Sequence, residues 1–260
     1  MTVRTTLFIV VILLTTAAWL LTYSTSQNMG SMMQIGVPMS LGMEGSASLA
    51  SFVVFTGMWV GMMVAMMLPS SYPTLLLHRT IYRKRNPSRP GGTLLFAIGY
   101  FFIWAAAGTV FYTAYVLIGG LRHSIPGSES FLLRGSGFAL LLSGLYQWSR
   151  LKGSCLRHCQ SPLHFVTEHW RDGSFGAVRM GAVHGIYCSG CCWGLMMILF
   201  VMGVMHLGWM AAIGALILLE KLAPSRKWIP HAIGTVFVIV GAVVMLFPKV
   251  LTRLSSYVLL

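Results

Sequence analysis

The sequence predicts an all-α protein, a polytopic transmembrane helix bundle of about seven spans. Three observations support this fold class: long apolar runs, a scarcity of charge, and basic residues confined to the segments between the runs. The chain has 260 residues, of which 56% are hydrophobic and 9% are charged. A soluble domain carries about 25% charged residues. A chain so poor in charge cannot cover a water-facing surface, and we expect its helices to face lipid.

A transmembrane helix needs about 20 apolar residues, with about 17 as the lower limit. One stretch, Met180–Leu219, is too long for a single crossing, and we place a turn within it at Val204–Gly208. This division leaves a short sixth span near Trp209–Leu219. The other predicted spans are Leu7–Tyr23, Ser51–Leu68, Thr93–Ile118, Phe131–Gln147 and Ala232–Phe247. If the first of them is a cleaved signal peptide, six spans remain.

The distribution of lysine and arginine predicts the orientation of the chain. With the N-terminus in the cytoplasm, fourteen of the 18 basic residues fall in segments on the inner side. Leaving the long stretch undivided would move Lys221, Arg226 and Lys227 outside, so the division is favoured. Residues 1–260 then form one integral membrane domain. We expect an outer methionine-rich loop at 24–50 and an inner cysteine-bearing loop, with one short helix, at 148–180.

The net charge of +13 does not indicate a nucleic-acid partner. The basic residues lie in short segments between apolar runs, where the positive-inside rule places them. We therefore expect the lipid bilayer, with its anionic headgroups, to be the partner of these residues.

The most chemical feature of the sequence is its set of cysteines, which fall into two groups on the predicted inner side. The first pair is spaced i, i+4 and the second group i, i+3, i+4, so each group shares one face of a helix. His184, four residues before the second group, lies on the same face as that group. The cysteines are Cys155, Cys159, Cys188, Cys191 and Cys192.

The odd number of cysteines argues against a closed disulfide framework, and the cytosol keeps thiols reduced. Thiolates select soft or borderline metals such as Cu(I) and Zn(II). We expect Lys152 and Arg157 to favour the thiolate form of the first pair. We expect His158 and His164 to be solvated histidines of the loop rather than ligands.

A methionine stripe occupies the second predicted span. Met58, Met62 and Met66 recur every four residues, and Met67 widens the stripe at its inner end. Thioethers bind Cu(I) and hardly bind Zn(II), so the stripe favours copper. The alternative is that flexible methionine side chains simply fill space between helices.

Two small-residue motifs, Gly57-x-x-x-Gly61 and Gly190-x-x-x-Gly194, allow helices to approach closely. If they pack the second and fifth spans together, the methionines and cysteines meet. Glu220 is the acidic residue placed within a predicted span. We expect it to pair with Lys221 or the interface, or to act as a ligand or as the partner of a ligand.

Several stretches between about Ser51 and Pro224 match a known family. They are Met62–Pro69, Lys152–Cys159, Pro162, Gly185, Cys188–Trp193, Met196 and Glu220–Lys221. These stretches resemble a bacterial family of predicted metal-binding integral membrane proteins, a domain of unknown function with a Cys-x-x-Cys-Cys-Trp motif. The resemblance implies an integral protein of the bacterial inner membrane with a metal site.

These features predict a soft-metal-binding membrane protein that handles or delivers Cu(I) at the inner membrane, together with a metal donor or acceptor protein. The five cysteines would be ligands, with His184 as a further candidate and with Met62 and Met66 as weak relay ligands. No nucleotide-binding Gly-x-x-x-x-Gly-Lys-[Ser/Thr] motif is present, which argues against primary pumping. We expect binding rather than enzymatic catalysis.

Three alternatives remain open at this point. The chain could be a membrane thiol–disulfide oxidoreductase, in which Cys191 and Cys192 exchange with the first cysteine pair. It could be a non-catalytic assembly protein in which Zn(II) fixes the inner loop. A mercury carrier is a variant of the copper hypothesis, because adjacent thiols also suit Hg(II).

Overall fold

The computed structural model describes residues 3–34, 49–85, 91–124, 128–202, 207–223 and 228–247. Within these ranges every regular element is helical, which confirms the predicted all-α class. The helices are α1 (Val3–Gln34), α2 (Leu49–Arg85), α3 (Gly92–Ser124), α4 (Ser128–Gln147), α5 (Arg150–Gln160), α6 (Pro162–His169), α7 (Gly173–Met202), α8 (Leu207–Leu222) and α9 (Trp228–Leu246).

Five of these helices are long and apolar enough to cross a membrane, judged by length and composition. They correspond to the first, second, third, fifth and last predicted spans. The remaining two predicted spans lie in α4 and in α8, whose 16 residues fall short of an ordinary crossing. The count of seven therefore stays a prediction. The apolar segments that qualify are Arg4–Ser26, Leu49–Arg85, Gly92–Ala114, Gly173–Leu199 and Trp228–Leu246.

The long apolar stretch lies in two helices as predicted, because α7 ends at Met202 and α8 begins at Leu207. Of the predicted turn Val204–Gly208, residues 204–206 lie outside the described residues, and Leu207 and Gly208 belong to α8. The two predicted loops differ from expectation. Helix α1 continues to Gln34, so the first part of the segment 24–50 is helical, and residues 35–48 lie outside the described residues. The inner segment 148–180 holds two short helices, α5 and α6, and the first turns of α7 rather than one short helix.

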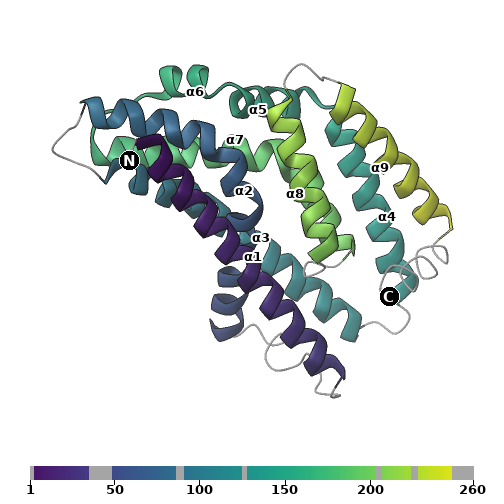
Figure 1. The fold of residues 1–260 in the computed structure, drawn as a ribbon. Helices are drawn as coiled ribbons and strands as arrows, with labels where there is room; N and C mark the ends of the chain where they lie inside the picture. Colours follow the sequence, from purple (N-terminus) through teal and green to yellow (C-terminus); the bar gives the residue numbers. More distant parts are fainter. Residues whose placement is uncertain are drawn as a thin grey trace.

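Helix α7 packs against four neighbours, namely α3, α4, α5 and α8. Figure 1 shows α4 and α9 side by side at one edge of the molecule, with α5 and α6 together along another. Helices α2 and α8 pack against each other, and α8 also contacts α7 and α5. This arrangement places five helices, namely α2, α3, α4, α5 and α8, around the cysteine-bearing part of α7.

The close approach of α3 and α7 depends on glycines that carry no side chain at the contact. A Cβ atom added to Gly181 of α7 would collide with the Phe96 carbonyl, and one added to Gly99 of α3 would collide with the Val178 carbonyl. At Gly185 the added atom would lie 3.0 Å from the Tyr100 carbonyl oxygen. The pair Gly181-x-x-x-Gly185 is therefore the small-residue motif that joins these two helices.

The predicted pairing of Gly57-x-x-x-Gly61 with Gly190-x-x-x-Gly194 is wrong. An added Cβ at Gly57 or Gly61 would meet nothing within 4 Å, so neither glycine marks a close helix contact. Gly190 instead faces Cys155 of α5, and Gly194 faces the backbone of Ser143 on α4. The motif on α7 therefore packs against α4 and α5 rather than against α2.

Candidate metal centre

Thiols from the two sequence segments meet where α5 packs on α7. The Cys191 Sγ and the Cys159 Sγ lie 3.8 Å apart. A Cβ added to Gly190 would lie 2.8 Å from the Cys155 Sγ, so this glycine leaves room for the Cys155 thiol beside α7. All five cysteines are free, Cys155 is half-buried and the other four are buried. The expected approach of the two cysteine groups is thus present in the fold.

Local sequence positions these thiols. Helix α5 begins after Ser149, whose hydroxyl accepts a hydrogen bond from the Lys152 backbone N–H at 3.1 Å. On α7 the i, i+3, i+4 spacing places three cysteines on one face. The Cys191 and Cys192 sulfurs lie 3.1 and 2.9 Å from the Cys188 carbonyl oxygen, so both side chains fold back along the helix.

The Cys188 sulfur is the centre of a buried polar network drawn from four helices. The Lys221 Nζ of α8 donates to the Cys188 Sγ at 3.0 Å and to the Ser70 Oγ of α2 at 3.0 Å. The Tyr100 hydroxyl of α3 lies 3.0 Å from the same sulfur. An adjacent ammonium group stabilises a thiolate, so Cys188 occupies the most electropositive position among the thiols.

The expected pairing of Glu220 with Lys221 is wrong. Glu220 forms a buried ion pair with Lys152 of α5, with a Lys152 Nζ to Glu220 Oε2 distance of 2.8 Å. Lys152 also donates to the Gln147 side-chain oxygen, and the Gln160 amide donates to the Glu220 backbone oxygen at 2.7 Å. This network connects α5 to the C-terminal end of α8. The ammonium group of Lys221 does not take part in it and contacts the Cys188 thiol instead.

The expected thiolate-stabilising role of Lys152 and Arg157 is also wrong. Lys152 is committed to Glu220, and the exposed Arg157 directs its Nε to the Gly153 carbonyl of its own helix. On α5, hydrogen bonds with the Cys188 and Cys191 thiols raise the pKa of Cys159, and burial raises the pKa of Cys155. The cation that the fold supplies to the thiols is therefore Lys221.

His184 is buried one turn before Cys188, with its ring stacked on Tyr100 at a centroid distance of 5.5 Å. The Phe165 ring of α6 lies 5.0 Å away. Neither imidazole nitrogen of His184 has a hydrogen-bond partner among the described residues. No hydrogen bond therefore joins His184 to a thiol among the described residues, and the lone pair of its ring is unused.

The methionine stripe is buried in the same core cluster as the four buried cysteines. Met62 and Met66 are almost fully buried, and Met66 lies against Gly214 of α8. Because Ser70 donates to the Met67 carbonyl and also contacts Lys221, the inner end of the stripe adjoins the Cys188 network. Met58, nearer the other end of α2, is half-buried.

Sequence reasoning missed three members of the Cys188 network, namely Ser70, Tyr100 and Lys221. Tyr100 gave no signal, because a tyrosine in an apolar run is usually a packing residue. Lys221 was visible as a cation at the end of an apolar span, but its sequence neighbour Glu220 offered a simpler partner. The signal that could have identified Lys221 is a lysine in an apolar helix with no acidic residue on the same face of that helix.

The fold and the site together define an all-helical protein with several helices able to cross a membrane. It holds a buried group of thiols, one of which accepts a hydrogen bond from Lys221. The family model described as PpoB2, copper chaperone, matches residues 56–244, and the chain belongs to this family. Membership supports copper binding and copper handling as its general role, in agreement with the metal-binding resemblance of the sequence. No curated protein and no solved structure matched the chain significantly.

Proposed function

We propose that the protein binds Cu(I) between α5 and α7 and delivers it to an acceptor protein at the bacterial inner membrane. The carrying observation is the 3.8 Å separation of the Cys159 and Cys191 sulfurs inside a buried thiol group. Two sulfurs at tetrahedral positions, with metal–sulfur bonds of about 2.3 Å, lie about 3.8 Å apart. This pair is thus spaced for one ion before any ion binds.

The donor set supports copper in the +1 state. Thiolates and thioethers are soft ligands that select Cu(I), whereas Zn(II) does not use thioethers. Cys159, Cys188, Cys191 and Cys192 are the proposed ligands in the buried group. Met62 and Met66 are proposed as weak relay positions, because they share the core cluster with these thiols. His184, whose ring nitrogens have no hydrogen-bond partner within the described part of the chain, is proposed as a further ligand.

The half-buried Cys155 suits transfer rather than storage. It lies on α5 against Gly190 and is less buried than the other four cysteines. A partially exposed thiol can accept an ion from a donor protein and pass it inward by ligand exchange. A fully enclosed group would hold the ion without such a route.

The membrane placement is part of the same proposal. Five apolar helices and the asymmetry of basic residues support a multi-pass inner-membrane protein with a cytoplasmic N-terminus. In this orientation α5 and α6 lie on the cytoplasmic side, where thiols remain reduced. The copper site would then lie where the inner end of α7 meets the cytoplasm.

X-ray absorption at the copper edge tests the proposal. Full-length protein purified in detergent is loaded with Cu(I), freed of excess metal against a competing chelator, and compared with a Zn(II)-loaded sample. We expect retained copper with a sulfur-dominated set of ligands and weaker retention of Zn(II). Loss of all copper to the chelator would overturn the proposed Cu(I) site. A set of copper ligands dominated by nitrogen and oxygen would overturn it as well. Preferential retention of Zn(II) would favour the structural zinc alternative.

Lys221 provides a mutational test of the thiol network. Replacing Lys221 with methionine keeps the side-chain length but removes the ammonium 3.0 Å from the Cys188 sulfur. Loss of such an outer-shell partner weakens metal binding about 10- to 100-fold, and we expect that range in a Cu(I) competition titration. Lys221→Arg retains the charge and should retain most of the affinity. An exposed control, Lys84→Met, should match the wild type, and equal affinity in Lys221→Met would contradict the assignment.

Thiol–disulfide exchange is the second candidate function, because the Cys159 and Cys191 sulfurs are already neighbours. Forming their disulfide requires the sulfurs to approach to about 2.05 Å. The two thiols would release two protons and two electrons to an acceptor of the quinone class. Mass spectrometry after incubation with a quinone distinguishes the functions: a Cys159–Cys191 disulfide favours exchange, and unchanged free thiols favour metal handling.

A further inference from the structure

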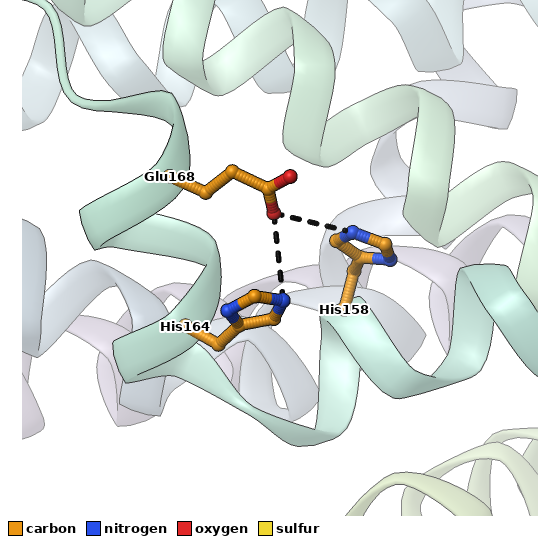
Figure 2. A group of neighbouring side chains, drawn as sticks. All are labelled: His158, His164 and Glu168. Carbon is orange, nitrogen blue, oxygen red and sulfur yellow. Dashed lines mark ion pairs between the residues drawn. The ribbon is translucent and has the colours of Figure 1, made fainter.

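A second group of ligand atoms lies on the surface formed by α5 and α6. Figure 2 shows the His158 and His164 rings directed toward one carboxylate oxygen of Glu168. The Glu168 Oε2 lies 3.6 Å from the His158 Nε2 and 3.5 Å from the His164 Nε2. One ligand atom from each of the three residues lies within 4.8 Å of the others. Two imidazoles and a carboxylate therefore converge on one point.

The sequence-based expectation that His158 is simply a solvated histidine is wrong. Its side chain is 18% exposed, and its ring stacks on Tyr187 at a centroid distance of 4.1 Å and an interplanar angle of 3°. Its Nδ1 lies 2.9 Å from the Ser154 carbonyl oxygen, which places the proton on Nδ1. The ring is thus held with Nε2 toward Glu168, in the manner by which backbone carbonyls orient metal-binding histidines.

The lone pairs of these three groups face one another. With the Nδ1 proton donated to Ser154, a neutral His158 presents a lone pair on Nε2 to the carboxylate oxygen of Glu168. Two facing lone pairs repel, so a ring proton, a water molecule or a metal ion between them relieves the repulsion. One divalent ion satisfies His158, His164 and Glu168 together.

Two of the three distances between ligand atoms are close to those of metal coordination. Ligand atoms at tetrahedral positions, with bonds of about 2.0–2.1 Å, lie about 3.3–3.4 Å apart. The two nitrogen–oxygen distances of 3.6 and 3.5 Å exceed this by only a few tenths of an ångström. The side chain of His164 is 64% exposed and that of Glu168 is 50% exposed, so both can adjust and leave positions open to water.

We propose that His158, His164 and Glu168 form a second metal site for a divalent first-row ion, with Zn(II) and Cu(II) as the preferred occupants. Imidazole and carboxylate donors suit these ions, whereas Cu(I) prefers the sulfur ligands of the buried group. The two sites adjoin, because His158 precedes Cys159 and its stacking partner Tyr187 precedes Cys188. The site does not depend on copper binding by the thiols.

Co(II) is the probe that separates the two sites, because thiolate ligation gives intense charge-transfer absorption and nitrogen or oxygen ligation gives only weak d–d bands. Full-length protein in detergent is titrated with Co(II), and bound Co(II) is then displaced with Zn(II). We expect the wild type to bind one Co(II) ion that shows only weak d–d bands, in addition to any Co(II) whose thiolate absorption reports on the buried cysteines. In His164→Ala/Glu168→Gln its affinity should fall at least tenfold, with Cu(I) retention unchanged.

His231→Ala, which removes an exposed histidine on α9, is the matched control and should leave Co(II) binding unchanged. Absence of a Co(II) site with nitrogen and oxygen ligands in the wild type would overturn the proposal. Equal binding in the double variant and the wild type would overturn it as well. Failure of Cu(I) retention alone would instead count against the proposed function, since it reports on the thiols.

Discussion

Replacing Cys188 with serine should cause the largest loss of Cu(I) binding of any single substitution in this protein. Its sulfur is the contact point of Lys221 and Tyr100, and its backbone oxygen anchors the Cys191 and Cys192 thiols. A serine hydroxyl is a hard donor that binds Cu(I) poorly. We expect the loss to exceed the about 10- to 100-fold that removal of an outer-shell partner produces.

A Cu(I) competition titration of the purified variant measures this effect. Ser189→Ala is the matched control, because Ser189 is the next residue on α7 and its buried hydroxyl has no hydrogen-bond partner among the described residues. The control should bind Cu(I) as the wild type does. Thermal unfolding of both variants separates loss of ligand from loss of fold. A Cys188→Ser protein that unfolds normally and binds Cu(I) with wild-type affinity would contradict the ligand assignment.

Replacing Glu220 with glutamine should cause the largest loss of stability. The Lys152 and Glu220 side chains are each 2% exposed and lie 2.8 Å apart. Glutamine keeps the shape of Glu220 but leaves the Lys152 ammonium buried without a counter-charge. Removing one partner of a buried ion pair costs about 3–5 kcal/mol, and we expect a decrease of that size in the free energy of unfolding.

Unfolding of the protein by denaturant in detergent micelles checks this value. The double variant Lys152→Met/Glu220→Leu removes both charges and should recover most of the lost stability, because apolar groups of similar size replace a buried pair well. If Glu220→Gln were as stable as the wild type, the pair would not be buried as described. If the double variant were less stable than Glu220→Gln, packing rather than charge would explain the loss.

The helices themselves could be predicted from the sequence, because apolar runs between charged segments specify where the chain can enter lipid. The same reasoning divided Met180–Leu219 into two helices, and α7 and α8 follow that division. It underestimated α2, which continues from Leu49 to Arg85 through Pro69 and Pro73. A proline usually ends or kinks a helix. The predicted span Ser51–Leu68 was therefore ended just before Pro69, which is too early.

The helix that each glycine motif packs against could not be predicted from the sequence. Both Gly181-x-x-x-Gly185 and Gly190-x-x-x-Gly194 lie on α7, and both satisfy the small-residue pattern. Which helix each motif meets depends on the arrangement of α3, α4 and α5 around α7, which no local pattern encodes. Similarly, the group of His158, His164 and Glu168 exists only because α5 ends and α6 begins at Ser161, so that the two helices contact each other there.

The sequence by itself determined the helical class, the spacing that places thiols on one face of α5 and of α7, and the softness of the donor set. Only the tertiary structure decided which charges serve the thiols. Successive residues of a helix point about 100° apart, because 3.6 residues complete one turn. Glu220 therefore faces Lys152 on α5 while Lys221 faces Cys188 on α7, although the two are neighbours in the chain.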